Sequence, residues 1–97
     1  MSIADAALIV DLRAQELRFR EPLERLVPNE VKVLTLDDIE GGRHGLSGDS
    51  REVVVICERG LRSSLAAKYL QADGVRAGHY PGGVPALRRA AGGQPPI

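Results

Sequence analysis

The residues that could do chemistry gather in one short stretch of the chain, around its only cysteine. Cys57 directly follows the apolar run Val53–Ile56, and the residues after it are Glu58, Arg59, Gly60, Leu61, Arg62 and Ser63. We expect Val53–Ile56 to be a buried strand and a helix to begin near Ser63, which places the thiol between a strand end and a helix N-terminus. The helix dipole, its free N–H groups and the two arginines favour thiolate over thiol. The pattern therefore predicts a nucleophilic cysteine of lowered pKa.

The glycine of this loop bears on whether the thiol is functional. Gly60 can adopt the positive φ that a tight loop needs to turn its N–H groups inward, and such a nest can hold an anion against the sulfur. The structural alternative is that Cys57 is a small buried hydrophobe, which is the commonest role of a free cysteine at a strand end. The strand–loop–helix context favours the functional interpretation.

The composition limits the kinds of protein the chain can be. Its 97 residues allow one domain, 1–97, in which residues 92–97 are expected to form a frayed tail. With 13 Lys and Arg against 13 Asp and Glu, bulk charge favours neither a nucleic-acid nor a membrane partner. One cysteine forms no internal disulfide and no multi-thiolate zinc site, and so few cysteines are typical of a reducing, cytoplasmic compartment. The apolar stretch 6–10 is too short for a secretory signal or a membrane span.

Apolar runs and turn residues predict an alternation of strands and helices. The expected strands are Leu8–Val10, Val31–Leu36, Val53–Ile56 and Val75–Tyr80. The expected helices are Pro22–Val27, Asp37–Glu40, Ser63–Asp73 and Val84–Ala91, and residues 41–49 are expected to form a loop. Continuous apolar character indicates strands that are buried on both faces. The fold class that follows is α/β, with a small, mainly parallel sheet of four or five strands flanked by helices and joined by right-handed crossovers.

Polar residues and glycines predict where these helices begin and end. Ser63 or Ser64 is expected to cap the start of the helix that follows the cysteine loop, and Asp37 the start of the helix before residue 41. Gly74 is expected to end the longer helix in a left-handed conformation.

The two histidines have structural interpretations. We expect His44 to be a solvated side chain in loop 41–49, and His79 to lie just before a glycine turn. Together with Cys57 they match no metal-ligand spacing, so no metal site is predicted.

Several motifs in the expected order resemble those of one known family. Cys57-x-x-Gly60-x-Arg62-Ser63 after an apolar strand resembles the active-site loop of rhodanese-like sulfurtransferases, and residues 63–74 resemble the helix that follows it. Residues 9–13, Ile-Val-Asp-Leu-Arg, resemble the family's strand that ends in Asp-x-Arg. Residues 80–87, Tyr-Pro-Gly-Gly-Val-Pro-Ala-Leu, resemble its Gly-Gly turn and final helix.

The chain also departs from this family pattern at three places. Only a few residues precede the Asp-x-Arg strand, where the family usually has a further strand and helix. Residues 19–30 stand in place of the usual Gly-His-Ile-x-Gly-Ala segment, and Leu87 stands where an aromatic residue is frequent. These departures concern the walls of the pocket, so the resemblance does not identify the substrate.

The resemblance implies a rhodanese-like α/β fold and sulfur transfer by double displacement. The Cys57 thiolate would attack the sulfane sulfur of thiosulfate or another small donor anion and become a persulfide. Its outer sulfur would then pass to cyanide or to an acceptor thiol, including a protein thiol. N–H groups of residues 58–63 would form a cradle, and Arg59 and Arg62 would be anion contacts or loop braces, with no metal and no cofactor. Asp11 and Arg13 are expected to form a structural ion pair near the site.

Two other functions stay open. A non-catalytic interaction or regulatory module would keep the fold and bind a partner, although such a module need not retain Cys57, Gly60 and Arg62. A phosphatase or arsenate reductase is disfavoured by the length of the loop. The related cell-cycle phosphatases carry Cys-x5-Arg, whereas Cys57 and Arg62 form Cys-x4-Arg, which suits the smaller sulfur centre.

Overall fold

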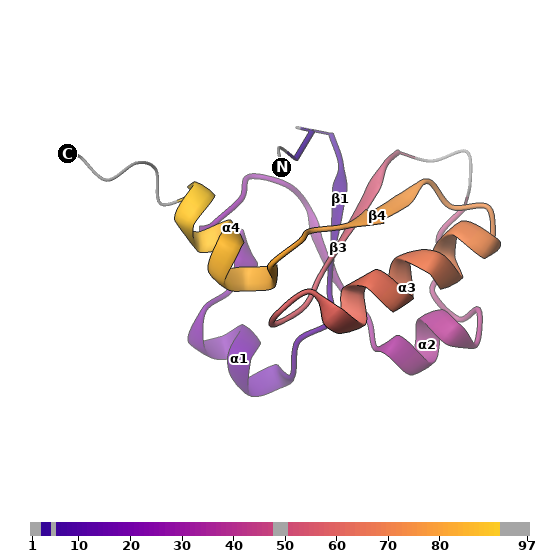
Figure 1. Ribbon diagram of the computed structural model, residues 1–97, viewed down its shortest axis with the longest axis horizontal. Helices are drawn as coiled ribbons and strands as arrows, with labels where there is room; N and C mark the ends of the chain where they lie inside the picture. Colours follow the sequence, from indigo (N-terminus) through magenta and orange to yellow (C-terminus); the bar gives the residue numbers. More distant parts are fainter. Residues whose placement is uncertain (1–2, 5, 48–50, 92–97) are drawn as a thin grey trace.

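Four parallel strands form the sheet at the centre of the protein (Figure 1). The computed structural model describes residues 3–4, 6–47 and 51–91, and the order across the sheet is β2-β1-β3-β4. The strands are β1 (Leu8–Asp11), β2 (Val31–Val33), β3 (Val53–Ile56) and β4 (Ala77–His79). Because all three pairings are parallel, the predicted α/β fold is confirmed. The predicted frayed tail, residues 92–97, and the last two residues of the predicted loop 41–49 lie outside the described residues.

The two central strands are buried on both faces of the sheet. Every residue of β1 and β3 is buried, and alternate side chains point to opposite faces. One core cluster contains Leu8, Val10, Val53 and Val55 together with Ile39, Ala66 and Leu70. The other contains Ile9, Val54 and Ile56 together with Leu23, Val84 and Leu87. The continuous apolar runs of the sequence therefore reflect a sheet that is covered on both sides.

Helices of different lengths cover the two faces. α2 (Leu36–Glu40) and α3 (Leu61–Ala72) contribute to the first core cluster, whereas the 3-10 helix Leu23–Arg25 and α4 (Gly83–Ala91) contribute to the second. Figure 1 shows α4 at one end of the molecule, near α1 (Gln15–Arg20), and α2 beside α3 at the other. None of the helices within the described ranges is long and apolar enough to cross a membrane.

The start of α3 differs from the sequence prediction. The helix begins at Leu61, and Ser63 and Ser64 lie inside its first turn instead of capping it. Gly60 occupies the cap position with a φ of 92° and turns the chain directly into the helix, so no side-chain cap is made. At the other end Gly74 has a φ of 85°, which confirms the predicted left-handed termination.

The region before α2 also differs, because a threonine rather than an aspartate caps this helix. Thr35 accepts a hydrogen bond from the N–H of Asp38 at 3.0 Å, whereas Asp37 lies within the helix. Strand β2 consequently ends at Val33, three residues earlier than predicted. Strand β4 is likewise shorter than the predicted Val75–Tyr80.

Two short helical segments depart further from the prediction. The segment predicted as a helix over Pro22–Val27 is a single 3-10 turn, Leu23–Arg25, with Pro22 at its cap. The sequence did not predict α1 at all. No residue of α1 is buried, so the sequence carries no apolar stripe that would indicate a helix there.

His44 is a buried structural residue, which corrects the prediction that it is solvated. Its side chain is only 6% exposed. Its Nδ1 accepts a hydrogen bond from the N–H of Leu46 at 3.0 Å, and its Nε2 lies 2.8 Å from the carboxylate of Asp73. The histidine thereby ties the loop after α2 to the end of α3, a contact between residues far apart in the sequence.

Candidate active site

The cysteine loop lies at the carboxyl edge of the sheet, where the strand order changes direction. From β1 the chain continues to β2 on one side, whereas β3 and β4 lie on the other side of β1. Asp11 and Ile56, the last residues of β1 and β3, pair with each other, so Cys57 follows directly beside the end of β1. In open α/β sheets ligands bind at such switch points. Cys57 therefore lies where the sequence predicted it, between the end of a buried strand and the start of a helix.

Backbone N–H groups converge on the sulfur of Cys57. Its Sγ accepts hydrogen bonds from the N–H of Gly60 at 3.1 Å and from the N–H of Ser63 at 3.3 Å. The residue is only 2% exposed. Gly60 adopts a left-handed conformation, which lets the backbone of residues 58–60 curl around the sulfur before α3 begins at Leu61.

Two opposing effects act on the pKa of the Cys57 thiol. Burial raises it, because a thiolate is poorly solvated in the interior. Hydrogen bonds to the sulfur lower it: they come from the hydroxyl and the N–H of Ser63 and from the N–H groups of Gly60 and Arg59. The hydrogen bonds outweigh burial, so the pKa lies below its usual value. Backbone and hydroxyl donors, rather than the arginine charges that the sequence suggested, are the cause.

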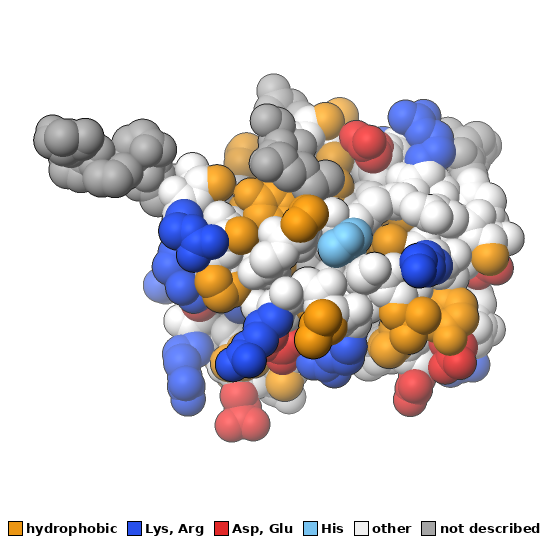
Figure 2. Space-filling model, in the orientation of Figure 1, with side chains coloured by type: hydrophobic (Ala, Val, Ile, Leu, Met, Phe, Trp, Pro, Cys, Tyr) orange, Lys and Arg blue, Asp and Glu red, His pale blue; other side chains and the backbone are white. Residues whose placement is uncertain are grey.

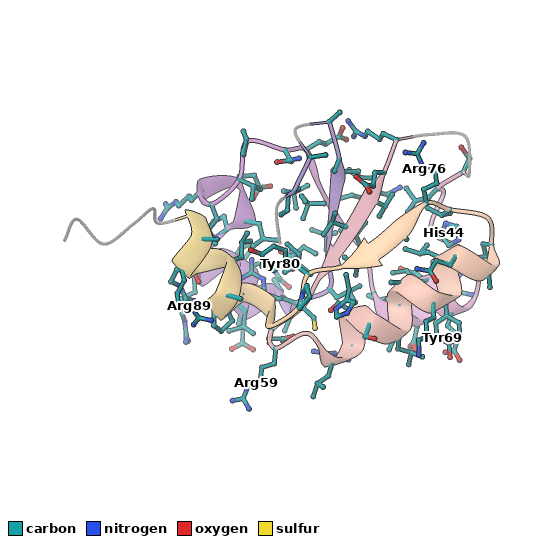
Figure 3. All side chains as sticks on the ribbon, turned by 45° about the horizontal axis from the view of Figure 1, so that its top comes forward. His44, Arg59, Tyr69, Arg76, Tyr80 and Arg89 are labelled. Atoms are coloured by element: carbon teal, nitrogen blue, oxygen red, sulfur yellow. The ribbon has the colours of Figure 1, made fainter. Side chains whose placement is uncertain are left out.

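The two arginines of the loop have different surroundings. Arg62, in the first turn of α3, donates a hydrogen bond at 2.9 Å to the carboxylate of Glu58, which lies in the loop four residues earlier. This exposed pair braces the loop. The side chain of Arg59 is exposed and makes no hydrogen bond or ion pair with the residues that the structure describes. Its side chain points away from the body of the molecule in Figure 3. Leu61, at the start of α3, is 80% exposed.

Two hollows adjoin the loop. The smaller one, about 210 Å³, is lined by Cys57 and its neighbours Glu58, Arg59, Leu61 and Arg62. The larger one, about 340 Å³, is lined by Glu58 and Arg59 on the loop side and by residues of α1 and α4 on the other. In Figure 2, Lys and Arg side chains gather over the end of the molecule that carries α1 and α4. A ligand in the larger hollow would thus approach the loop from a basic surface.

A buried ion pair supports the wall of the larger hollow. Asp11 and Arg13 form the pair predicted from the sequence: their side chains are each 3% exposed and approach to 3.0 Å. Arg13 also donates to the carbonyl oxygens of Leu17 at 3.4 Å and Glu21 at 2.8 Å, which holds α1 against the end of β1. Glu21 in turn accepts a hydrogen bond from Arg88 of α4 at 2.8 Å, and this bond lowers the pKa of the glutamate. The loop thus faces two helices that are fixed to each other.

A buried serine connects Cys57 with a histidine that the sequence placed outside the site. The hydroxyl of Ser63 lies 3.4 Å from Nδ1 of His79, the last residue of β4. The sequence signal that could have found His79 is its place at the end of a strand adjacent to β3, directly before the Gly-Gly turn. Within the described ranges, no group of three His, Cys, Asp or Glu side chains could hold a metal ion.

The Gly82-Gly83 turn packs against the cysteine loop through its backbone. Gly83 has a φ of 66°, and a Cβ there would lie 2.7 Å from Cα of Arg59 and 2.6 Å from the carbonyl carbon of Glu58. The N–H of Val84 donates to the carbonyl of Cys57 at 3.2 Å. The turn that the sequence indicated therefore supports the loop by close approach as well as by reversing the chain.

We expect Gly83→Ala to loosen this support. The strained φ and the contact with the loop should together lower the free energy of unfolding by about 2–4 kcal/mol, and the displaced loop should slow alkylation of Cys57. Urea denaturation and the rate of reaction with iodoacetamide measure the two effects. Gly74→Ala is the matched control, because Gly74 also has a positive φ but has no atom within 4 Å of a Cβ position. Equal effects of the two substitutions would contradict the packing role.

Comparisons with known proteins agree in the fold. A rhodanese homologue from Thermus thermophilus is 35% identical, with 82% of each chain covered and a TM-score of 0.63. A protein of unknown function from Rhodopseudomonas palustris, described as a possible tyrosine phosphatase, is 31% identical over 94% of this chain and 70% of its own, with a TM-score of 0.65. A rhodanese-like domain protein from Staphylococcus aureus is 24% identical over 87% of this chain and 76% of its own, with a TM-score of 0.70. No family model and no curated protein matches the chain.

Proposed function

Because the chain belongs to the rhodanese-like family, we propose that it is a sulfurtransferase that carries a sulfane sulfur on Cys57. The observation that supports this most directly is the thiol itself, which accepts N–H hydrogen bonds from Gly60 and Ser63 and has a lowered pKa. A thiolate is the form that attacks sulfur, and the lowered pKa favours this form.

The reaction that we propose has two displacements. The Cys57 thiolate attacks the outer sulfur of thiosulfate or a related small anion, a new S–S bond forms, and sulfite leaves with the electron pair of the bond that breaks. The nucleophile of the acceptor, a thiolate or cyanide, then attacks the outer sulfur of the persulfide, and the Cys57 thiolate leaves. The N–H groups of the loop hold the negative charge on sulfur at the beginning and at the end of the cycle.

The remaining loop residues have supporting roles in this scheme. The Glu58–Arg62 pair braces the loop, and Arg59 is the cation available to attract an anionic donor. Asp11 and Arg13 act by holding α1 beside the loop. The larger hollow, next to Arg59, leaves room for an acceptor bigger than cyanide, such as a thiol on a small molecule or on a protein.

An intact-mass measurement tests the proposal. We expect the purified protein to gain the mass of one sulfur atom when it is treated with thiosulfate, and to lose it again when cyanide is added. A protein that never gains sulfur from thiosulfate, from a persulfide or from a polysulfide donor would contradict the proposal. If, in addition, another protein co-purifies with this one, the results would favour a non-catalytic interaction module.

We expect Arg59→Ala to weaken the use of anionic donors. Loss of an exposed cation at the rim of the site should raise KM for thiosulfate about threefold to tenfold with little change in kcat, and added salt should diminish the difference. Steady-state kinetics at two ionic strengths measure this. Arg76→Ala is the matched control, since Arg76 is also exposed and Figure 3 shows it at the opposite end of the molecule. Equal KM values for the two variants would contradict the role of Arg59.

Phosphate-ester hydrolysis is the second candidate, because of the similarity to the protein described as a possible tyrosine phosphatase. The loop opposes it, since Cys57 and Arg62 are separated by four residues and the N–H groups of Gly60 and Ser63 are directed at the sulfur itself. Turnover of an aryl phosphate that is lost in Cys57→Ser would support the hydrolase. Turnover that is absent, or unaffected by the substitution, would exclude it.

A further inference from the structure

We propose that His79 is a positioning residue that holds the hydroxyl of Ser63 in the orientation in which it donates to the sulfur of Cys57. The inference concerns the same thiol as the proposed function and takes its significance from that function. It is carried by three residues from three neighbouring elements: Cys57 after β3, Ser63 in the first turn of α3, whose N–H donates to the sulfur at 3.3 Å, and His79 at the end of β4, whose Nδ1 lies 3.4 Å from the Ser63 hydroxyl.

The hydroxyl of Ser63 has one proton and two possible partners. Ser63 is completely buried, so water does not compete for its hydroxyl. The N–H of Ser63 donates to the sulfur of Cys57 at 3.3 Å, which places the serine beside the thiol whose pKa its hydroxyl lowers. The hydroxyl oxygen lies 3.4 Å from Nδ1 of His79. A hydroxyl donates once, so it can donate to the thiolate only if His79 does not take that proton. A hydrogen on Nδ1 of His79, donated to the serine oxygen, satisfies this condition.

The backbone holds His79 where it can do this. His79 pairs with Val55 in the sheet, two residues before Cys57, and the N–H of Tyr80 donates to the carbonyl of Val55 at 3.0 Å. Because β4 is fixed to β3 by these bonds, the imidazole stays beside the first turn of α3 with limited freedom. It is half-buried, so one side of the ring remains open to solvent.

The charged groups near the sulfur do not replace this contact. Glu58 and Arg62 are paired with each other on the outside of the loop, and Arg59 points into solvent. None of the described charged side chains of the loop makes a hydrogen bond to Ser63, so His79 is the polar side chain that can select the direction of its hydroxyl. The two hydrogen bonds would also polarise each other in the interior, which strengthens the donation to the thiolate.

The test is the pH dependence of the alkylation rate of Cys57 in four proteins: wild type, His79→Ala, Ser63→Ala and the double variant. Loss of one neutral hydrogen bond of about 1 kcal/mol corresponds to a fall of about fivefold in the thiolate population at pH values below the thiol pKa. We therefore expect His79→Ala to shift the rate profile to higher pH, so that the alkylation rate at a given pH below the thiol pKa falls about fivefold. We expect no further shift when it is added to Ser63→Ala, because His79 acts through the serine.

Two further variants separate positioning from general disturbance. An asparagine at position 79 can place an amide N–H at the same number of bonds from the backbone as Nδ1, so we expect His79→Asn to restore most of the wild-type profile. Ser64→Ala, a half-buried serine next to Ser63, should leave the profile unchanged. Circular dichroism confirms that each variant is folded.

The outcomes distinguish this inference from the proposed function. An unchanged profile in His79→Ala, or an equal shift by His79→Ala in the presence and absence of the Ser63 hydroxyl, overturns the inference. These measurements use iodoacetamide and need no sulfur donor. A protein that shows the expected shifts but never forms a persulfide would contradict the sulfurtransferase while leaving the role of His79 intact.

Discussion

Replacing Cys57 by serine should abolish sulfur transfer. We expect the rate to fall by roughly 10⁴-fold or more, the scale on which removal of a catalytic nucleophile acts. The serine hydroxyl keeps the shape of the side chain and can accept the N–H groups of Gly60 and Ser63, but it stays protonated at neutral pH and forms no persulfide. Steady-state assay with thiosulfate and cyanide, combined with intact mass, measures the loss.

The comparison for this experiment is a variant that keeps the thiol. Ser64→Ala removes a hydroxyl from the same turn of α3 and should retain the wild-type rate. Similar thermal unfolding temperatures of the two variants would show that any difference in rate comes from the chemistry. Retention of full activity by Cys57→Ser would contradict the mechanism.

Replacing Asp11 by alanine should lower the free energy of unfolding more than breaking any exposed ion pair in the described part of the chain would. Both side chains of the Asp11–Arg13 pair are buried, so the substitution leaves a guanidinium in the interior without its counter-charge. We expect the free energy of unfolding to fall by about 3–5 kcal/mol, a large share of the stability of a domain of this size. Urea denaturation followed by circular dichroism measures the change.

The matched control for Asp11 is an ion pair on the surface. Arg51 pairs with Glu30 while both remain largely exposed, and Arg51→Ala should cost less than about 1 kcal/mol. If Asp11→Ala were as mild as Arg51→Ala, the pair would not be what holds α1 against β1. A buried pair of this kind acts on the site indirectly, because α1 lines the larger hollow.

The parts of the structure that local sequence determines were predicted well. Val53–Ile56 is apolar throughout and ends in Cys57, so both the buried strand and the position of the thiol followed from the sequence. The parallel sheet followed from the same continuous apolar runs. The sequence also predicted the left-handed end of α3 at Gly74, because glycine adopts this conformation without a Cβ penalty.

The parts that depend on distant contacts were not predictable in the same way. His44 is buried because it reaches Asp73, which lies 29 residues away, and a polar residue in a glycine-rich segment gives no sign of that partner. The start of α3 at Leu61 depends on Gly60, whose conformation replaces the cap that a serine would otherwise provide. The contact between Ser63 and His79 exists only because β4 pairs with β3, so pairing in the sheet rather than local spacing determines it.

The close approach of Gly83 to Glu58 and Arg59 constrains how this fold can change over evolutionary time. A longer loop of the Cys-x5-Arg kind cannot arise by insertion alone, because the backbone of the glycine turn already occupies the space beside the loop. The insertion and a compensating shift of residues 82–83 must occur together, since each change by itself disrupts the contact. We therefore expect strong epistasis between the two segments: the effects of a loop insertion and of a change at residues 82–83 on stability should not add.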